Sequence, residues 1–199
     1  PEYYHQTDDY KNTFTFKPFL RLDPTDAERT HADIRDLSWL HQADDWEVLA
    51  GISKVFWGVT ESRHLVDVIN QTDLVEDVDQ EDKLGELMLQ YARFTDVGTF
   101  RFFALPYFRE RTFPGERGRL RGPKVVDTDN AQYTHAQDER RPSFAARYTH
   151  YYDIWDIGLA HFHGIGREPR LVDTGNGKLT PFYDVIDQTS LDLQATKGG

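Results

Sequence analysis

The sequence contains no cysteine and no long uninterrupted run of apolar residues. Without cysteine, the chain has neither a disulfide framework nor a thiolate metal site. A membrane-spanning helix needs about 18 or more apolar residues in a row, so a helical membrane protein is excluded. Transmembrane β-strands alternate between two sides and give only a weak hydropathy signal. Low hydropathy therefore does not separate a soluble protein from a membrane barrel.

Positive charge is also scarce, since 23 Lys and Arg stand against 34 Asp and Glu for a net charge of -11. Nucleic-acid binding requires a basic face, so we expect no nucleic-acid partner. The 199 residues are enough for one domain, or for about eight to ten barrel strands of roughly ten residues each. We find no repeat, low-complexity tract or linker, and we expect a single domain over residues 1–199.

The two ends of the sequence are abrupt. The chain begins at Pro1, without an initiator Met or an export signal. At the other end, residues 190–196 alternate as a strand does, and Lys197, Gly198 and Gly199 follow as a turn that precedes a return strand. We therefore expect these residues to be part of a longer protein.

Alternation of aromatic or β-branched residues with polar ones is the recurring pattern, and it predicts strands. In residues 13–22, Phe14, Phe16, Leu20 and Leu22 fall on one face. Pro24 then marks a turn. The other expected strands cover about residues 30–41, 46–57, 86–95, 98–109, 143–151, 154–164 and 190–196. Short turns at 43–45, 96–98 and 152–153 join them as hairpins.

Long connections separate these hairpins: an acidic one at about 58–85, a basic one at about 109–142, and a third at 165–179. Short turns at one rim and long loops at the other are typical of outer-membrane barrels. The pattern predicts an all-β fold, an antiparallel up-and-down transmembrane β-barrel of which this chain is a part. Aromatic residues near the expected strand ends fit interfacial girdles, and the alternative is a soluble β core. They are Trp46, Phe56, Trp57, Tyr107, Phe108, Tyr151, Tyr152, Trp155 and Phe162.

Several segments resemble a known family. They are Phe56-Trp57-Gly58-Val59-Thr60-Glu61-Ser62 with residues 64–73, Leu105-Pro106-Tyr107-Phe108 through Gly115, Trp155 through Leu159, and Gly166 through Pro169. In these, the chain resembles poorly characterised porin-like proteins of Gram-negative outer membranes, over about residues 16–196. The resemblance implies an outer-membrane barrel and no particular substrate. Complete family members are longer, so closure of a barrel by this chain alone is not expected.

A cluster of arginines is the most unusual charge feature of this acidic chain. Arg109, Arg111, Arg117, Arg119 and Arg121 surround residues 113–115. Folded inward, and joined by Arg147 from a strand, they would form a constriction that attracts anions. The alternative is a solvated external loop, whose arginines pair with Glu61, Asp67 or Asp73 or contact lipopolysaccharide phosphates.

Two further clusters invite a metal interpretation. Asp77, Asp79, Glu81 and Asp82 offer the oxygen ligands that calcium prefers, but without EF-hand spacing, and a solvated loop is the alternative. His161 and His163 alternate on one strand and share a face, with His150 nearby. Histidines so placed more often lie at an interface or line a wet lumen.

Catalytic groupings lack a diagnostic context. Glu61 and Ser62 lie beside His64, and Asp153 and Asp156 lie near histidines. There is no nucleophile elbow, phosphate-binding glycine loop or zinc-protease helix. We expect no catalytic residue, no enzyme activity and no cofactor.

The expected function is passive or weakly selective passage of small polar or anionic solutes across a bacterial outer membrane. The expected partners are outer-membrane lipid and lipopolysaccharide, with a homo-oligomer or a larger membrane assembly. Arg147, Thr149, Asp192 and Gln194 would face water, and Leu191, Leu193 and Ala195 would face lipid. The alternatives are a soluble, exported β-sandwich that binds carbohydrate and, less favoured, a hydrolase on a β scaffold.

Overall fold

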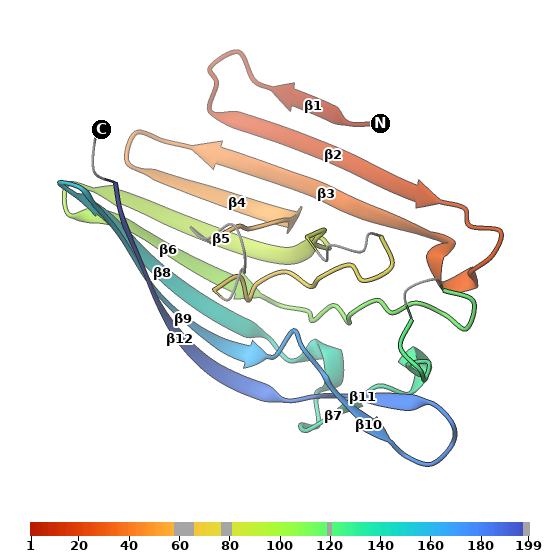
Figure 1. The fold of residues 1–199 in the computed structure, drawn as a ribbon. Helices are drawn as coiled ribbons and strands as arrows, with labels where there is room; N and C mark the ends of the chain where they lie inside the picture. Colours follow the sequence, from red (N-terminus) through yellow and green to blue (C-terminus); the bar gives the residue numbers. More distant parts are fainter. Residues whose placement is uncertain (58–65, 77–80, 119–120, 197–199) are drawn as a thin grey trace.

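The computed structural model describes residues 1–57, 66–76, 81–118 and 121–196. Nine strands form one sheet in the order β1-β2-β3-β4-β5-β6-β8-β9-β12, and every neighbouring pair is antiparallel (Figure 1). The bounds are β1 Tyr3–Gln6, β2 Asn12–Arg21, β3 His31–Gln42, β4 Trp46–Ser53, β5 Glu86–Thr95, β6 Gly98–Leu105, β8 Ser143–Tyr152, β9 Trp155–Ile165 and β12 Val185–Ala195.

A second, small sheet lies beside one end of the large one (Figure 1). It consists of β10 Arg170–Asp173, β11 Leu179–Tyr183 and β7 Gln132–Tyr133, with β11 and β7 parallel. Three short 3-10 helices, η1 Ala27–Arg29, η2 Thr128–Asn130 and η3 Asp138–Arg140, lie in the connections. Among the described residues, no helix has the length and apolar character needed to cross a membrane.

The large sheet has two edges, β1 and β12, and these strands do not pair with each other. The expected all-β fold with an antiparallel main sheet is confirmed. The residues that the structure describes do not form a closed barrel.

The short connections lie at one end of the sheet and the long connections at the other, as the sequence predicts. Hairpin turns at 43–45, 96–97 and 153–154 lie at one end of the sheet, together with residues 7–11 between β1 and β2 (Figure 1). The connections 22–30, 54–85, 106–142 and 166–184 leave from the opposite end. We call these ends the turn end and the connection end.

Two predicted strands are shorter than expected. The predicted strand 46–57 ends at Ser53, because the Asn70 side chain donates to the carbonyl oxygens of Ser53 and Leu84 and accepts from the Val55 N–H. These hydrogen bonds replace strand pairing, so the chain leaves the sheet after Ser53. The predicted strand 98–109 ends at Leu105 because Pro106 cannot donate to a ladder. The prediction also missed β1, β7, β10 and β11 and the first half of β12.

Strand alternation gives the large sheet two distinct faces. In β5, Glu86, Met88, Gln90 and Ala92 are buried, whereas the side chains between them are more exposed. The buried residues lie on the inner face, against which the connection 54–85 packs. The opposite side is the outer face.

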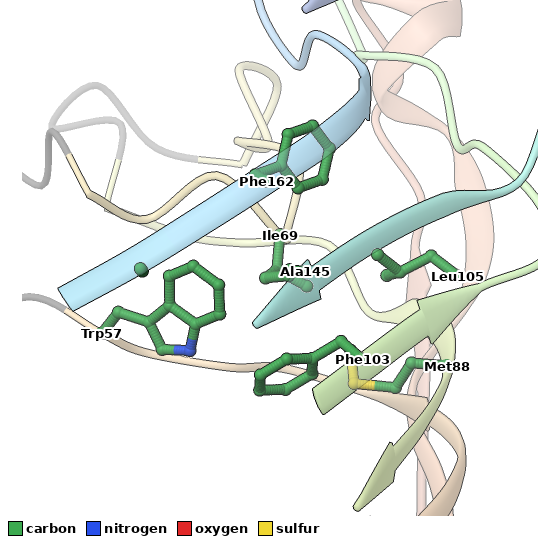
Figure 2. Packing of buried hydrophobic residues seen from close by; sticks show 8 residues of the cluster. Trp57, Ile69, Met88, Phe103, Leu105, Ala145 and Phe162 are labelled. Carbon is green, nitrogen blue, oxygen red and sulfur yellow. The ribbon is translucent and has the colours of Figure 1, made fainter. Parts of the chain in front are cut away.

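The main hydrophobic core lies between the inner face and that connection. Trp57 and Ile69 come from the connection, and Phe103, Ala145 and Phe162 come from β6, β8 and β9 (Figure 2). The rings of Trp57 and Phe103 lie 5.3 Å apart. The core therefore covers the inner side of β5 to β9 and leaves their outer face bare.

Candidate functional site

The outer face of the large sheet carries mostly apolar side chains on every strand. Register places the outward residues of all nine strands in continuous rows, for example Leu89, Ala104 and Phe144. Nothing else in the described part of the chain covers these rows. The large exposed hydrophobic side chains of the outer face are Tyr3, Phe14, Phe16, Leu20, Leu37, Trp39, Leu87, Leu89, Tyr91, Phe102, Phe144, Tyr152, Trp155, Leu159, Leu191 and Leu193.

Aromatic rings line the turn end of the outer face. The His41 ring lies 6.0 Å from Trp39 and 5.2 Å from Trp46, and Trp46 lies 6.5 Å from Tyr91. Farther along the sheet, contacts at 4.9, 6.2 and 6.5 Å join Phe100, Tyr148, His150 and Tyr152 in that order. We call these eight residues the turn-end belt.

The structure corrects part of the predicted aromatic girdle. Trp46 and Tyr152 belong to the turn-end belt, and Trp155 pairs with Tyr152. Trp57, Phe108 and Phe162, however, are buried on the inner side. Trp57 points inward because the chain leaves β4 at Ser53, and Phe162 lies on the inward parity of β9, opposite Ala145. Phe108 packs with Ile165 and Tyr183 in a second, smaller cluster.

The inner face carries polar and charged side chains beside the hydrophobic core, and Arg147 projects from it on β8. Both terminal nitrogens of Arg147 donate to the two carboxylate oxygens of Asp192 at 2.9 Å, and Nη2 also donates to the Trp57 carbonyl oxygen. The pair spans β9 above Gly158, where a Cβ atom would lie 2.0 Å from Asp192 Oδ2. A forked Arg–carboxylate pair is among the stronger hydrogen-bonded ion pairs. It joins β8, β12 and the connection 54–85.

The two predicted sets lie on opposite faces of the sheet, as expected, and one part of the prediction needs correction. Arg147 and Asp192 share the inner face, and Leu191 and Leu193 lie on the outer face. Arg147 does not face open water, because Trp57 covers it and its exposure is 7%.

A second ionic network lies at the connection end. Arg35 Nη2 donates to Asp73 Oδ2 at 2.7 Å, and Arg35 Nη1 lies 3.3 Å from Asp33 Oδ2. Arg109 Nη2 reaches the other Asp33 oxygen at 2.8 Å, and Thr112 Oγ1 donates to Asp73. These contacts link β3 to two connections that are distant in sequence. They also hold the connections against the inner side of the sheet.

Asp73 is fully buried in this network. Burial alone raises the pKa of the Asp73 carboxyl, but hydrogen bonds from Arg35 and Thr112 outweigh it and hold this pKa below its usual value. The Asp73 carboxylate is therefore charged at neutral pH. Arg35 in turn stacks 4.2 Å above the Phe19 ring.

The structure does not bring the predicted arginines together in one row. Arg109 is paired with Asp33, Arg111 lies 3.7 Å from Glu168, and Arg147 is paired with Asp192. Arg117 and Arg121 are exposed at the connection end, and Arg119 lies outside the described residues. Since three of these guanidinium groups face carboxylates, the geometry does not support a constriction that attracts anions.

Acidic side chains dominate a pocket of about 630 Å³ at the connection end. Arg117 and Lys178 also line it. Its carboxylates come from η1, η2 and the segments beside them. They are Asp23, Asp26, Glu28, Glu116, Asp127 and Asp129.

The calcium and histidine predictions have separate outcomes. Asp77 and Asp79 lie outside the described residues, and within the described part no group of three or more His, Asp or Glu side chains is arranged to hold a metal, Glu81 and Asp82 included. His161 and His163 do share the outer face, as expected. Asp187 is their neighbour, with its Oδ1 atom 2.8 Å from His163 Nδ1.

The catalytic groupings gain no support from the structure. Glu61, Ser62 and His64 lie outside the described residues. Asp153 is in the hairpin turn between β8 and β9, with a φ of 54°. Asp156 lies on the inward parity of β9, opposite Tyr151.

Several charged residues that organise the inner side were not among the predicted site residues. Asp33 and Arg35 are two residues apart in β3. Residues at this spacing share one face of a strand, so the sequence could have predicted that these two charges lie together. Arg167 had no such signal: it donates to the Ile69 carbonyl oxygen at 2.7 Å and lies 3.6 Å from Glu86, a contact made across distant segments.

Comparison of the chain with protein-family models, curated proteins and solved structures gives no match. The family resemblance stays a prediction.

Proposed function

We propose that this chain forms part of the wall of an outer-membrane β-barrel, through which small polar solutes pass passively. The observation that carries this proposal is the contrast between the two faces of one sheet. The outer face is mostly apolar and uncovered from β1 to β12, whereas the inner face carries Arg147, Asp192, Gln90 and Glu47 beside a hydrophobic core that the connection 54–85 covers.

The extent of the apolar face is the first support. Nine strands at about 4.8 Å spacing make a surface on the order of 40 Å wide. Water-exposed apolar patches on soluble monomers rarely exceed a few hundred Å². Lipid covers such a face without leaving backbone groups unpaired, because each interior strand is bonded on both sides.

The turn-end belt is the second support. Trp and Tyr gather at the interfaces of membrane barrels because their rings are apolar and their N–H and O–H groups reach water. The belt lies beside the short turns, and most strands of the large sheet have 8 to 12 residues. Those lengths suit tilted membrane strands of about 9 to 11 residues.

The two alternative functions fit the geometry less well. A carbohydrate-binding sandwich buries the apolar face of each sheet against a second sheet. Here the covered face is the inner one, and the small sheet lies beside the end of the large sheet. A hydrolase would need a catalytic grouping, and the described residues do not assemble one of those considered.

Tryptophan fluorescence tests the membrane placement, because the four tryptophans divide between the faces. Trp39, Trp46 and Trp155 lie on the outer face, and Trp57 is 5% exposed in the core. Four single-tryptophan variants are made by changing the other three to Phe and are reconstituted in bilayers that contain brominated lipid. We expect bromine to quench Trp39, Trp46 and Trp155 at least about threefold more strongly than Trp57, since contact with the acyl region decides quenching.

Trp57 is the internal control for this measurement. Equal quenching of all four, or no quenching without loss of structure, would contradict the membrane placement. Conductance of the reconstituted protein in a planar bilayer then tests the passage of solutes.

A further inference from the structure

A shallow groove of about 430 Å³ interrupts the outer face above β6 and β8. Register places Ala104 beside Phe144 and Phe102 beside Ala146, so the two alanines lie diagonally between two phenylalanines. Leu89 closes the side toward β5. Phe102 and Phe144 are each about half exposed, at 51% and 52%. The groove therefore exists because the two central residues have the small side chain of alanine.

The β9 side of this groove is polar. His161 and His163 line it, and their side chains are 55% and 41% exposed. Asp187 accepts from His163 Nδ1 at 2.8 Å, which leaves His163 Nε2 as the acceptor for Arg141 Nη2 at 3.3 Å. Asp187 and Arg141 thus contact opposite nitrogens of one imidazole ring.

Arg141 differs from most arginines of this chain. Its Nη1 atom donates to the Gln137 side chain at 3.4 Å, and its Nε atom is buried without a hydrogen-bond partner. Among the described residues, it has no carboxylate within ion-pair distance. The Arg141 guanidinium is therefore held by an imidazole nitrogen and an amide oxygen at the edge of an apolar groove.

We propose that this groove binds an acyl chain of lipid A, with a lipid A phosphate at the Arg141 guanidinium. The inference rests on the proposed membrane function. The polar side of the groove lies toward the connection end, and long loops of outer-membrane barrels face outward. That end meets the outer leaflet, where lipid A places phosphate groups above several acyl chains. Guanidinium N–H groups bind phosphate oxygens.

Native mass spectrometry of the reconstituted protein tests this site by measuring the dissociation constant of lipid A. Phosphate-free lipid A and phosphatidylethanolamine are the comparison ligands. We expect lipid A to bind at least about tenfold more tightly than its phosphate-free form, because a charge-assisted contact is lost without the phosphate. Arg141→Gln should remove that preference, and Ala104→Phe with Ala146→Phe should weaken both ligands.

Two matched controls accompany these variants. Arg93→Gln removes a cation of the outer face at the turn end, and Ala32→Phe adds a ring to that face on β3, away from the groove. Both should leave the lipid A affinity unchanged. Equal affinity for phosphate-free lipid A or for phosphatidylethanolamine would overturn the inference, as would an equal effect of the controls.

The comparison of ligands on the unchanged protein does not depend on whether any variant folds. Tryptophan quenching on the same sample separates the two proposals. Quenching of Trp39, Trp46 and Trp155 without a lipid A preference removes this inference alone. Absence of quenching removes the membrane placement as well.

Discussion

Individual charged residues hold the inner side of this molecule together, and Asp73 is the most deeply buried of them. It joins Arg35 of β3 to Thr112, which lies in another connection. A buried ion pair contributes little net stability over an apolar pair, but removal of one partner leaves a buried charge unpaired. The sensitivity of such a site to substitution and to pH is therefore high.

We expect Asp73→Asn to lower the free energy of unfolding by about 2–4 kcal/mol at pH 7. The pKa of Asp73 is lower in the folded than in the unfolded chain, so its contribution is present above the unfolded value of about 4. The contribution is lost as pH falls through the folded pKa. Urea unfolding of both proteins at pH 7, 5 and 3 measures the difference, which should shrink only at the lowest pH.

Asp45→Asn is the matched control for this change. Asp45 pairs with Arg93 at the surface, where both side chains are about half exposed. Such exposed pairs contribute at most about 1 kcal/mol, so Asp45→Asn should lower the free energy of unfolding only slightly. A loss for Asp73→Asn no larger than for Asp45→Asn, or one that stays constant down to pH 3, would show that the network does not carry this energy.

The hairpins are the elements in which sequence and structure agree best. Phe100, Phe102 and Ala104 alternate with inward residues in β6, and Gly98, the first residue of β6 after the turn at 96–97, has a φ of 124°. A positive φ favours glycine, and a short turn followed by such a residue is a common hairpin connection. A Cβ atom on Gly98 would lie 2.6 Å from the Thr149 carbonyl oxygen of the next strand.

Gly98→Ala should therefore lower the free energy of unfolding by about 2–4 kcal/mol, combining backbone strain with a clash against β8. Gly177 also has a positive φ, of 86°, but a Cβ atom there meets nothing within 4 Å. Gly177→Ala should lower the free energy of unfolding by only about 1 kcal/mol, because backbone strain is its only cost. Chemical unfolding of both variants separates the two contributions, and equal losses would contradict the steric one.

The elements that sequence reasoning missed depend on partners far along the chain. β7 has two residues and pairs with β11, about 50 positions later, so no local period marks it. Trp57 lies in an aromatic stretch that predicts a strand, and side chains of the following connection end that strand early: Asn70 bonds the backbone at Ser53 and Val55, and Asp67 accepts from the Trp57 N–H. Local alternation predicts the hairpins well. It does not predict which polar side chain will compete for the backbone of a strand.

At the scale of the whole molecule, charge is distributed unevenly. The net charge is -11, and several inward arginines are paired with carboxylates. The carboxylate-lined pocket at the connection end adds to the negative potential there. Rings and pockets of one charge sign set the selectivity of a pore for the opposite ion.

We therefore expect a weak preference for cations, measured as the reversal potential of the bilayer current in asymmetric potassium chloride. Arg109→Gln should leave that preference in place, because Arg109 is paired with Asp33 and its loss frees a negative charge. Glu116→Gln, in the carboxylate-lined pocket, should reduce it. Anion preference in the unchanged protein, or a switch of selectivity on Arg109→Gln, would show that the arginines govern passage.

The parallel contact between β11 and β7 has a consequence for how the chain assembles. Each β-hairpin joins strands that are close in sequence and closes with a small loss of chain entropy. The small sheet instead brings Tyr183 onto Tyr133, and these rings stack 5.4 Å apart. Such a contact becomes favourable only after β8 and β9 hold the two connections near each other. The small sheet should therefore form late in folding, as a cap on strands that are already in place.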